Sequence, residues 1–371
     1  MRKITLTRRY EQMQVKSRIA SQLRAFHPQI RKTLVENISD LVVALVQARH
    51  VHLAKIAEKL NRRGKEESRE NWIRRQLDNH TMGTWQLFQP MAECLLQGLV
   101  GHAVYLILDP TDLDAERCTV MIMLAYRGRA LPLIWMSFEI KPGMIQDSVT
   151  LLFTELRRWL PQGVKVYLLA DREFHGVDML DLICQQGWTP IVRCKGTVTA
   201  TLADGTQRPL NAWTPPVGQM TFHPEVWLTA EQFGPLSLST SCAPAKPGKD
   251  LDPWFIISTE FAGPQIIRIY EKRFWIEETF RDFKGYGFHL GETGVQDPER
   301  LDRLVLLIAL ACWWVISIGL WVHRMGLRGE VDRTKHPKLS LFQLGLRYIN
   351  RLLHLGEVPD VRFIPALIGA L

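Results

Sequence analysis

Residues 304–322 form the one long stretch of the chain that is uncharged and almost wholly apolar. As a helix, its nineteen residues would extend about 28 Å, nearly the thickness of a bilayer core. The stretch follows a start typical of soluble helices, with Asp297 as the N-cap, Pro298 at the first position and Glu299 in the first turn. We therefore predict a helix buried on all sides in a large core, and a membrane span is the alternative.

The net charge of +8 is unevenly distributed along the 371 residues. Residues 1–100 hold 18 Lys and Arg against 9 Asp and Glu, whereas the remainder holds 28 against 29. All of the excess positive charge is therefore N-terminal. A basic first domain on a neutral body is typical of proteins that bind nucleic acid, although a basic solubilising surface has the same composition.

The cysteines do not form a metal-binding pattern. No two of them make a Cys-x-x-Cys pair, and no cysteine and histidine spacing is typical of a zinc site. We interpret them as free, mostly buried thiols in a reducing compartment. The first residues lack the apolar region of a signal peptide, so we expect a cytoplasmic protein. The six are Cys94, Cys118, Cys184, Cys194, Cys242 and Cys312.

Residues 1–100 are predicted to be mainly helical. Apolar periodicity indicates helices over residues 53–60 and 66–77, and Gly64 lies in the short turn between them. This arrangement is compatible with a helix-turn-helix, although two helices that merely pack together have the same pattern. The second helix would offer three arginines to DNA: Arg69, Arg74 and Arg75.

Residues 101–195 alternate between short apolar runs and amphipathic segments. The order is strand, strand, strand, helix, strand, helix, strand, which predicts a mixed α/β sheet. The first strand, residues 104–108, is followed by Asp109, and the fourth, residues 164–170, is followed by Asp171. Ligand sites in such sheets lie beyond the carboxyl ends of the strands, so we expect the two aspartates to approach one another.

Residues 196–262 differ in composition from the sheet region before them. They hold eight of the twenty prolines, which argues against long helices. Residues 197–202 alternate in polarity and lead to the hairpin turn pair Asp204-Gly205. We therefore predict a β-rich insertion that separates the sheet from the segment after it.

Residues 270–284 predict one helix with two different faces. At about 100° per residue, the apolar residues Ile276, Phe280 and Phe283 face the core. A carboxylate among cations on the other face suggests metal-assisted phosphoryl chemistry. The polar residues, which gather within roughly 80° of one another, are Tyr270, Arg273, Glu277, Arg281 and Lys284.

Asp109, Asp171 and Glu277 would together make a site of three carboxylates. Without a nearby cysteine or histidine cluster, such a set favours Mg²⁺ or Mn²⁺. Either aspartate taken alone is more simply explained as a cap or turn residue. Asp112 competes with Asp109 for its role, and Glu278 competes with Glu277. Helical phase favours Glu277, because Glu278 lies about 100° further round the helix.

Three segments resemble the signature of one enzyme family. DDE transposases of the bacterial insertion-sequence family four carry a Tyr-Arg-Glu-Lys signature, to which this chain's run is similar: Tyr270-x2-Arg273-x3-Glu277-x6-Lys284. That family's two aspartate segments resemble Asp109-Pro-Thr and Asp171-Arg-Glu here, in the expected order. The resemblance covers about residues 100–325 and extends more loosely to both ends.

The resemblance implies a ribonuclease-H-like catalytic core with a β-rich insertion before the last catalytic helix. Asp109, Asp171 and Glu277 would bind two Mg²⁺ or Mn²⁺ ions, and water and then a 3′-hydroxyl would attack phosphodiester bonds. The DNA partners would be double-stranded ends with terminal inverted repeats and a target DNA, held by a homodimer on paired ends. The setting implied is the nucleoid of the bacterial cytoplasm, without a membrane span.

The resemblance also implies contacts to the DNA backbone near the cleaved end. A guanidinium fork and a lysine point charge suit phosphate, although ion pairs with Asp282 or Glu278 are the alternative use of these cations. The implied contacts are Tyr270, Arg273, Lys284 and Arg172. An aromatic residue of the insertion would stack a displaced base, and burial is the alternative for each candidate: Trp213, Trp227 and Trp254.

We therefore predict an endonuclease-type transposase that catalyses metal-dependent cleavage and strand transfer at the ends of an insertion sequence. The alternative is a catalytically silent, transposase-derived DNA-binding regulator. The predicted regions are a helical DNA-binding domain (1–100), the first part of the core (101–195), the β-rich insertion (196–262), the catalytic and buried helices (263–325) and a C-terminal helical region (326–371).

Overall fold

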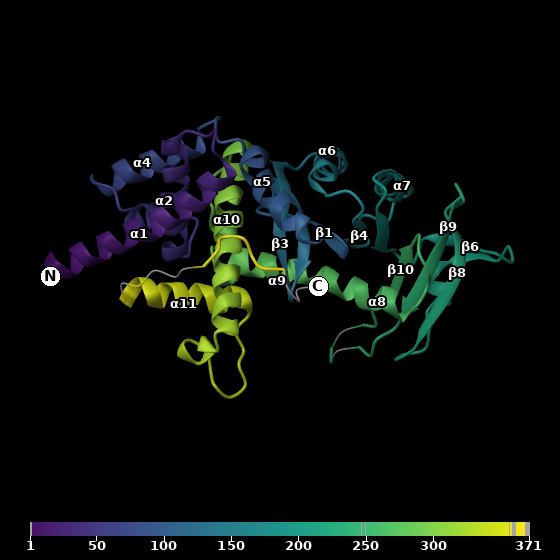
Figure 1. The fold of residues 1–371 in the computed structure, drawn as a ribbon. Coiled ribbons are helices and arrows are strands. Elements are labelled where there is room, and N and C mark those ends of the chain that lie inside the picture. Colours follow the sequence, from purple (N-terminus) through teal and green to yellow (C-terminus); the bar gives the residue numbers. More distant parts are fainter. Residues whose placement is uncertain (1, 246, 249, 356, 358–360, 368–371) are drawn as a thin grey trace.

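The computed structural model describes residues 2–245, 247–248, 250–355, 357 and 361–367. One sheet of ten strands has the order β3-β2-β1-β4-β5-β10-β9-β8-β6-β7. It runs from the middle of the molecule to one end, and the N-terminal helices gather at the other end (Figure 1). The strands predicted for the core and those predicted for the insertion are therefore parts of a single sheet.

The first five strands form the mixed half of this sheet. β1 pairs antiparallel with β2 and parallel with β4, which in turn pairs parallel with β5. The element order is the one predicted, and it is consistent with the ribonuclease-H-like core that the resemblance implies. The bounds are β1 (Ala103–Asp112), β2 (Arg117–Tyr126), β3 (Arg129–Glu139), α6 (Met144–Trp159), β4 (Lys165–Ala170), α7 (Val177–Gln185) and β5 (Thr189–Arg193).

β2 and β3 are joined by a two-residue hairpin turn. Arg127 and Gly128 both have positive φ, of 47° and 77°, which matches the twist of the flanking strands. Glycine adopts this conformation without steric cost, and Arg127 adopts it less readily. The next residue, Arg129, is the first residue of β3.

The second half of the sheet is antiparallel. β10 pairs with β5, so the insertion extends the core sheet rather than forming a separate layer. β8 was not predicted, because Pro224 and two irregularities in its pairing with β9 interrupt the alternation of its side chains. The bounds are β6 (Thr199–Leu202), β7 (Gln207–Pro209), η1 (Leu210–Trp213), β8 (Met220–Leu228), β9 (Phe233–Ser241) and β10 (Trp254–Ser258).

Residues 264–286, called here the site segment, follow the last strand. The prediction of one uninterrupted α-helix is wrong, because a 3₁₀ turn and a π-helical turn divide the segment. Such turns change the number of residues per turn, so side chains after them no longer follow the 100° pattern. The parts are α8 (Pro264–Glu271), η2 (Lys272–Phe274), α9 (Trp275–Arg281) and η3 (Asp282–Tyr286).

α10 (Pro298–Arg324) is the predicted apolar helix, and its burial is confirmed. The Asp297 side chain caps it by accepting the backbone N–H of Arg300 at 2.9 Å. Among the described residues it is the one helix with the length and composition to cross a membrane. However, 94% of its most apolar 18-residue window is buried inside the protein, against β3, α2 and α11 (Leu341–Leu355).

The helices of residues 1–100 pack on one another and on α10 (Figure 1). In the part of the chain that the structure describes, all six cysteines are free, and four of them are buried. The helices are α1 (Arg2–Phe26), α2 (Lys32–Ala48), α3 (Leu53–Lys59), α4 (Glu66–Leu77) and α5 (Thr84–Gln97), and the short turns η4 (Leu290–Glu292) and η5 (Leu327–Glu330) flank α10.

Candidate active site

The register of two parallel strands brings Asp109 and Asp171 to matching positions. The last paired residues of β1 and β4 are Ile107 and Leu169, and each aspartate lies two residues further along. Because side chains alternate along a strand, both carboxylates leave the same face. The prediction that β1 ends before Asp109 is wrong, since β2 continues to pair with β1 as far as Asp112.

Arg273 of the site segment lies between these aspartates and Glu277. Its Nη2 donates to Asp109 Oδ1 at 3.0 Å and lies 3.4 Å from Asp171 Oδ2. Its Nη1 donates to Glu277 Oε1, one helical turn further on. Only 8% of the Arg273 side chain is exposed. The three predicted carboxylates, from β1, the end of β4 and α9, therefore surround one guanidinium.

The competing acidic residues lie outside this cluster. Glu278 accepts a hydrogen bond from Arg281 Nη1 at 2.6 Å and lies 3.7 Å from Arg129. Asp112 is exposed at the end of β1, and its backbone carbonyl accepts a hydrogen bond from Lys284. In this arrangement, Glu277 rather than Glu278 is the glutamate beside Asp109 and Asp171.

The protonation of the cluster is governed by burial. Burial raises the pKa of Asp109 to about 7; Arg273 opposes this rise, while Asp171 and Glu277 add to it by repulsion. At neutral pH Asp109 is therefore only partly ionised, and a cation bound there must displace a proton while it offsets the repulsion among the three carboxylates.

The donor set fits a hard divalent cation. Within the described residues, the cluster offers carboxylate oxygens from three elements, and the one group that stands among them is a cation, Arg273. Carboxylate oxygens are the ligands of Mg²⁺ and Mn²⁺. Asp109, Asp171 and Glu277 are therefore the residues able to hold such ions.

Comparison with known families agrees with this geometry. A family model described as the transposase DDE domain matches residues 106–314, a span that includes all three carboxylates and the whole insertion. The chain belongs to the DDE transposase family. Among curated proteins, none matches the chain.

The other predicted site residues of the transposase differ in exposure. Tyr270 is 1% exposed, and its ring packs against Trp254 and Phe274 at centroid distances of 5.3 Å and 6.2 Å. Lys284 is half-buried beside Asp112, whereas Arg172 is exposed just after Asp171. Neither Arg273 nor Lys284 forms the ion pair with Asp282 or Glu278 considered as the alternative; the described partners of those acids are Arg129 and Arg281.

Three hydrogen bonds that sequence reasoning missed fix α9 and the start of η3 to β3. The Thr279 hydroxyl accepts the backbone N–H of Ala130 at 2.8 Å and donates to its carbonyl at 3.1 Å. Arg129 Nε donates to Asp282 Oδ2 at 2.6 Å in an almost fully buried pair. Burial raises the pKa of Asp282 to about 6, which Arg129 opposes. These contacts set the height of Glu277 above the sheet.

The candidate helix-turn-helix of the transposase consists of α3 and α4. Arg74 and Arg75 are exposed, whereas Arg69 is half-buried. A surface hollow on this helix is lined by polar and charged residues: Lys65, Glu67, Ser68, Asn71, Arg74 and Arg75. In the insertion, Trp213, Trp227 and Trp254 are all half-buried, and Trp254 stacks on Phe274 of the site segment at 5.5 Å.

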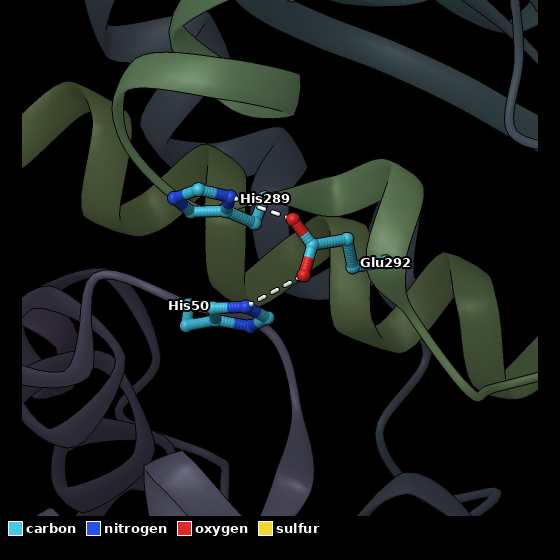
Figure 2. Close-up of side chains that lie close together, drawn as sticks. All are labelled: His50, His289 and Glu292. Atoms are coloured by element: carbon cyan, nitrogen blue, oxygen red, sulfur yellow. Dashed lines mark hydrogen bonds and ion pairs between the residues drawn. The ribbon is translucent and has the colours of Figure 1, made fainter.

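A second polar cluster joins the N-terminal helices to the chain before α10. His50 and His289 stack with ring centroids 4.7 Å apart, and Glu292 accepts from both, at 3.1 Å from His50 Nε2 and 2.9 Å from His289 Nδ1 (Figure 2). Sequence reasoning missed this cluster, because His50 lies more than 200 residues before His289 and Glu292 along the chain.

The hydrogen bonds of His50 define the character of this second cluster. The backbone N–H of His52 donates to His50 Nδ1 at 3.0 Å, so the neutral ring carries its proton on Nε2, toward Glu292. Burial also lowers the pKa of His50, which favours the neutral ring. A metal would need the lone pair of Nε2, so the cluster is a hydrogen-bonded junction rather than a prepared metal site.

Proposed function

We propose that this transposase belongs to insertion-sequence family four and catalyses metal-dependent DNA cleavage and strand transfer at the ends of such an element. The observation that carries the proposal is that Asp109, Asp171 and Glu277 all contact Arg273, beyond the carboxyl ends of the paired parts of β1 and β4. The run from Tyr270 to Lys284 supports assignment to this family.

In the proposed reaction, the three carboxylates hold two Mg²⁺ or Mn²⁺ ions. When bound, such a pair activates the attacking oxygen, first of water and then of a 3′-hydroxyl, and stabilises the leaving oxygen. The chain's own contribution is positional. β1 and β4 fix the two aspartates in register, and the contacts of Thr279 and Asp282 hold Glu277 over them.

The proposed DNA contacts divide into accessible and buried groups. Arg172 is exposed and Lys284 half-buried, so both can meet a phosphate with little rearrangement. Tyr270 and Arg273 are buried, so their contact with DNA requires residues 270–274 to shift. The 3₁₀ turn at Lys272–Phe274 lies within this stretch.

The remaining parts of the proposal concern the partners. The basic N-terminal helices would bind the terminal inverted repeats, with Arg74 and Arg75 accessible for phosphate or base contacts. We propose a homodimer on paired ends, a separate target DNA and a location at the nucleoid of the bacterial cytoplasm. The charge distribution, with all excess positive charge in residues 1–100, supports DNA as the partner.

The test is cleavage of a duplex that carries the terminal inverted repeats of the proposed element. We expect strand breaks at the repeat ends with Mg²⁺ or Mn²⁺ and none with a chelator present. Asp171→Asn should abolish cleavage, whereas the control Asp178→Asn, on the exposed side of α7, should not. Sequence-specific binding by the wild-type chain without metal-dependent breaks would instead support the catalytically silent regulator.

A further inference from the structure

Arg273 contacts all three of the carboxylates that are proposed to hold divalent ions. Its two terminal nitrogens contact Asp109 Oδ1, Asp171 Oδ2 and Glu277 Oε1, one oxygen from each carboxylate. A cation bound by the same three residues would compete for these lone pairs and would be repelled by the guanidinium. The arginine and a divalent ion therefore cannot both occupy the centre of the cluster.

The hydrogen bonds of the Arg273 guanidinium are also incomplete. Among the described residues, its Nε is buried and has no hydrogen-bond partner. A buried donor without a partner is destabilising, so this arrangement satisfies the carboxylates better than it satisfies the arginine. A phosphate oxygen near Arg273 would offer the acceptors that the protein lacks, because the guanidinium fork matches phosphate geometry.

Given the proposed function, we propose that Arg273 is an internal counter-cation that closes the metal site of the DNA-free protein and that a DNA phosphate draws it away. The carboxylates then become available to divalent ions only when DNA is bound. The device would prevent ions from being loaded, and bonds from being cut, before the DNA end is in place. By thermodynamic linkage, DNA and the ion must each tighten the binding of the other.

The first experiment measures Mn²⁺ binding to the full DNA-free chain by calorimetry. Arg273→Gln removes the competing charge, so we expect Mn²⁺ to bind about tenfold more tightly or better, the scale of one charge-assisted hydrogen bond. The matched control is Arg281→Gln, which removes an exposed arginine from the same site segment and should leave Mn²⁺ affinity unchanged. Equal affinity in the wild-type chain and in Arg273→Gln would overturn the proposal.

Arg273→Lys is the second variant, and it retains a buried charge if the glutamine variant fails to fold. A lysine cannot contact three carboxylates as a planar fork does, so Mn²⁺ should bind this variant more tightly than the wild type. Wild-type affinity in Arg273→Lys, in a chain with a normal unfolding transition, would count against competition.

The second experiment uses the wild-type protein alone and compares Mn²⁺ affinity with and without a terminal-repeat duplex, after subtracting ions bound by the duplex. We expect DNA to tighten Mn²⁺ binding by about the same factor as Arg273→Gln does, and to have little further effect on that variant. Unchanged affinity on adding DNA overturns the proposal.

These binding measurements separate the two proposals. If the protein does not cleave DNA but shows the Arg273-dependent change in Mn²⁺ affinity, the counter-cation proposal stands and the proposed reaction is wrong. If the protein cleaves DNA and all variants bind Mn²⁺ equally, the proposed reaction stands and the counter-cation proposal is wrong.

Discussion

α10 and the site segment follow one another in the chain, and both are helical, but they differ in regularity. α10 is 27 residues without interruption, buried on nearly every side. The site segment changes from α to 3₁₀ to α to π geometry within residues 264–286. A helix that only fills a core can stay regular, whereas one that brings polar groups to a fixed point takes irregular turns.

The packing of the two regions shows the same difference. α10 approaches α11 so closely that Gly319 and Gly345 leave no room for side chains between the backbones. In the site segment, the π turn at Asp282–Tyr286 is followed by Gly287, where a Cβ would lie 2.5 Å from the Asp282 carbonyl oxygen. Glycine allows close helix crossing in one region and a change of helical geometry in the other.

Glu277→Gln should break the site segment's function without breaking its fold, and it is the largest effect we expect. The change removes one negative charge from the cluster, so DNA cleavage should fall by about a thousandfold or more, the scale of losing a principal electrostatic group. The Glu277 side chain is 43% exposed, so stability should change little. Cleavage and thermal unfolding measure the two effects.

Glu278→Gln is the matched control for this prediction. Glu278 is the neighbouring carboxylate, 37% exposed, and its described partners are Arg281 and Arg129 rather than the site. It should retain most of the cleavage activity. An active Glu277→Gln beside an inactive Glu278→Gln would reverse the assignment.

Gly319→Ala in α10 should mainly lower stability, whereas Glu277→Gln mainly lowers cleavage. The new methyl group would meet the backbone of Leu341, which cannot move without separating α10 from α11. We expect a loss of about 3 kcal/mol in the free energy of unfolding, measured by urea denaturation. The control is Gly294→Ala, where no atom lies within 4 Å of the new Cβ. If Gly319→Ala is as stable as the control, the close helix crossing is not present in solution.

The contrast also explains what the sequence could predict. The uncharged run and the cap at Asp297 were enough for α10, because burial depends on composition and a local start signal. Asp109 and Asp171 were found because they follow apolar runs, and the parallel register then places them together. These signals come from residues close together in the chain, so they can be recognised in a single sequence.

The missed features depend on distant partners. Nothing local to Arg273 shows that it would stand between Asp109 and Asp171, more than 100 residues away. The same is true of Arg129 beside Asp282, and of His50 beside Glu292. The 3₁₀ and π turns were missed because a fixed angle per residue assumes the regular geometry that they interrupt.

Thr279→Val should loosen the site segment from the sheet. The valine keeps the shape but leaves the buried Ala130 N–H without its acceptor, which costs about 2 kcal/mol of stability. Cleavage should fall as well, because Glu277 loses its fixed height. Thr154→Val, where an exposed hydroxyl donates only to the Thr150 carbonyl, should stay within about 0.5 kcal/mol of wild type in urea denaturation. Equal stability of the two variants would remove Thr279 as an anchor.

The smallest effect that we predict concerns the titration of one aspartate in each region. Burial raises the pKa of Asp109 in the site and of Asp302 in α10, each to about 7. Because the unfolded chain ionises near 3.8, the folded state holds the extra protons between about pH 4 and 7, and stability falls as pH rises through this window. Asp302→Asn should reduce that slope.

Only Asp109 should couple the titration to metal binding. An ion must displace its proton, so Mn²⁺ affinity should rise by up to about tenfold per pH unit below 7, about 1.4 kcal/mol, and level off above it. Asp302 accepts the backbone N–H of Ser137 at 2.8 Å and is not one of the three carboxylates around Arg273, so Asp302→Asn should leave this calorimetric profile unchanged. If Asp302→Asn changed the pH dependence of Mn²⁺ affinity, α10 would take part in metal binding. The distinction between α10 as a packing helix and the site segment as the source of the chemistry would then be wrong.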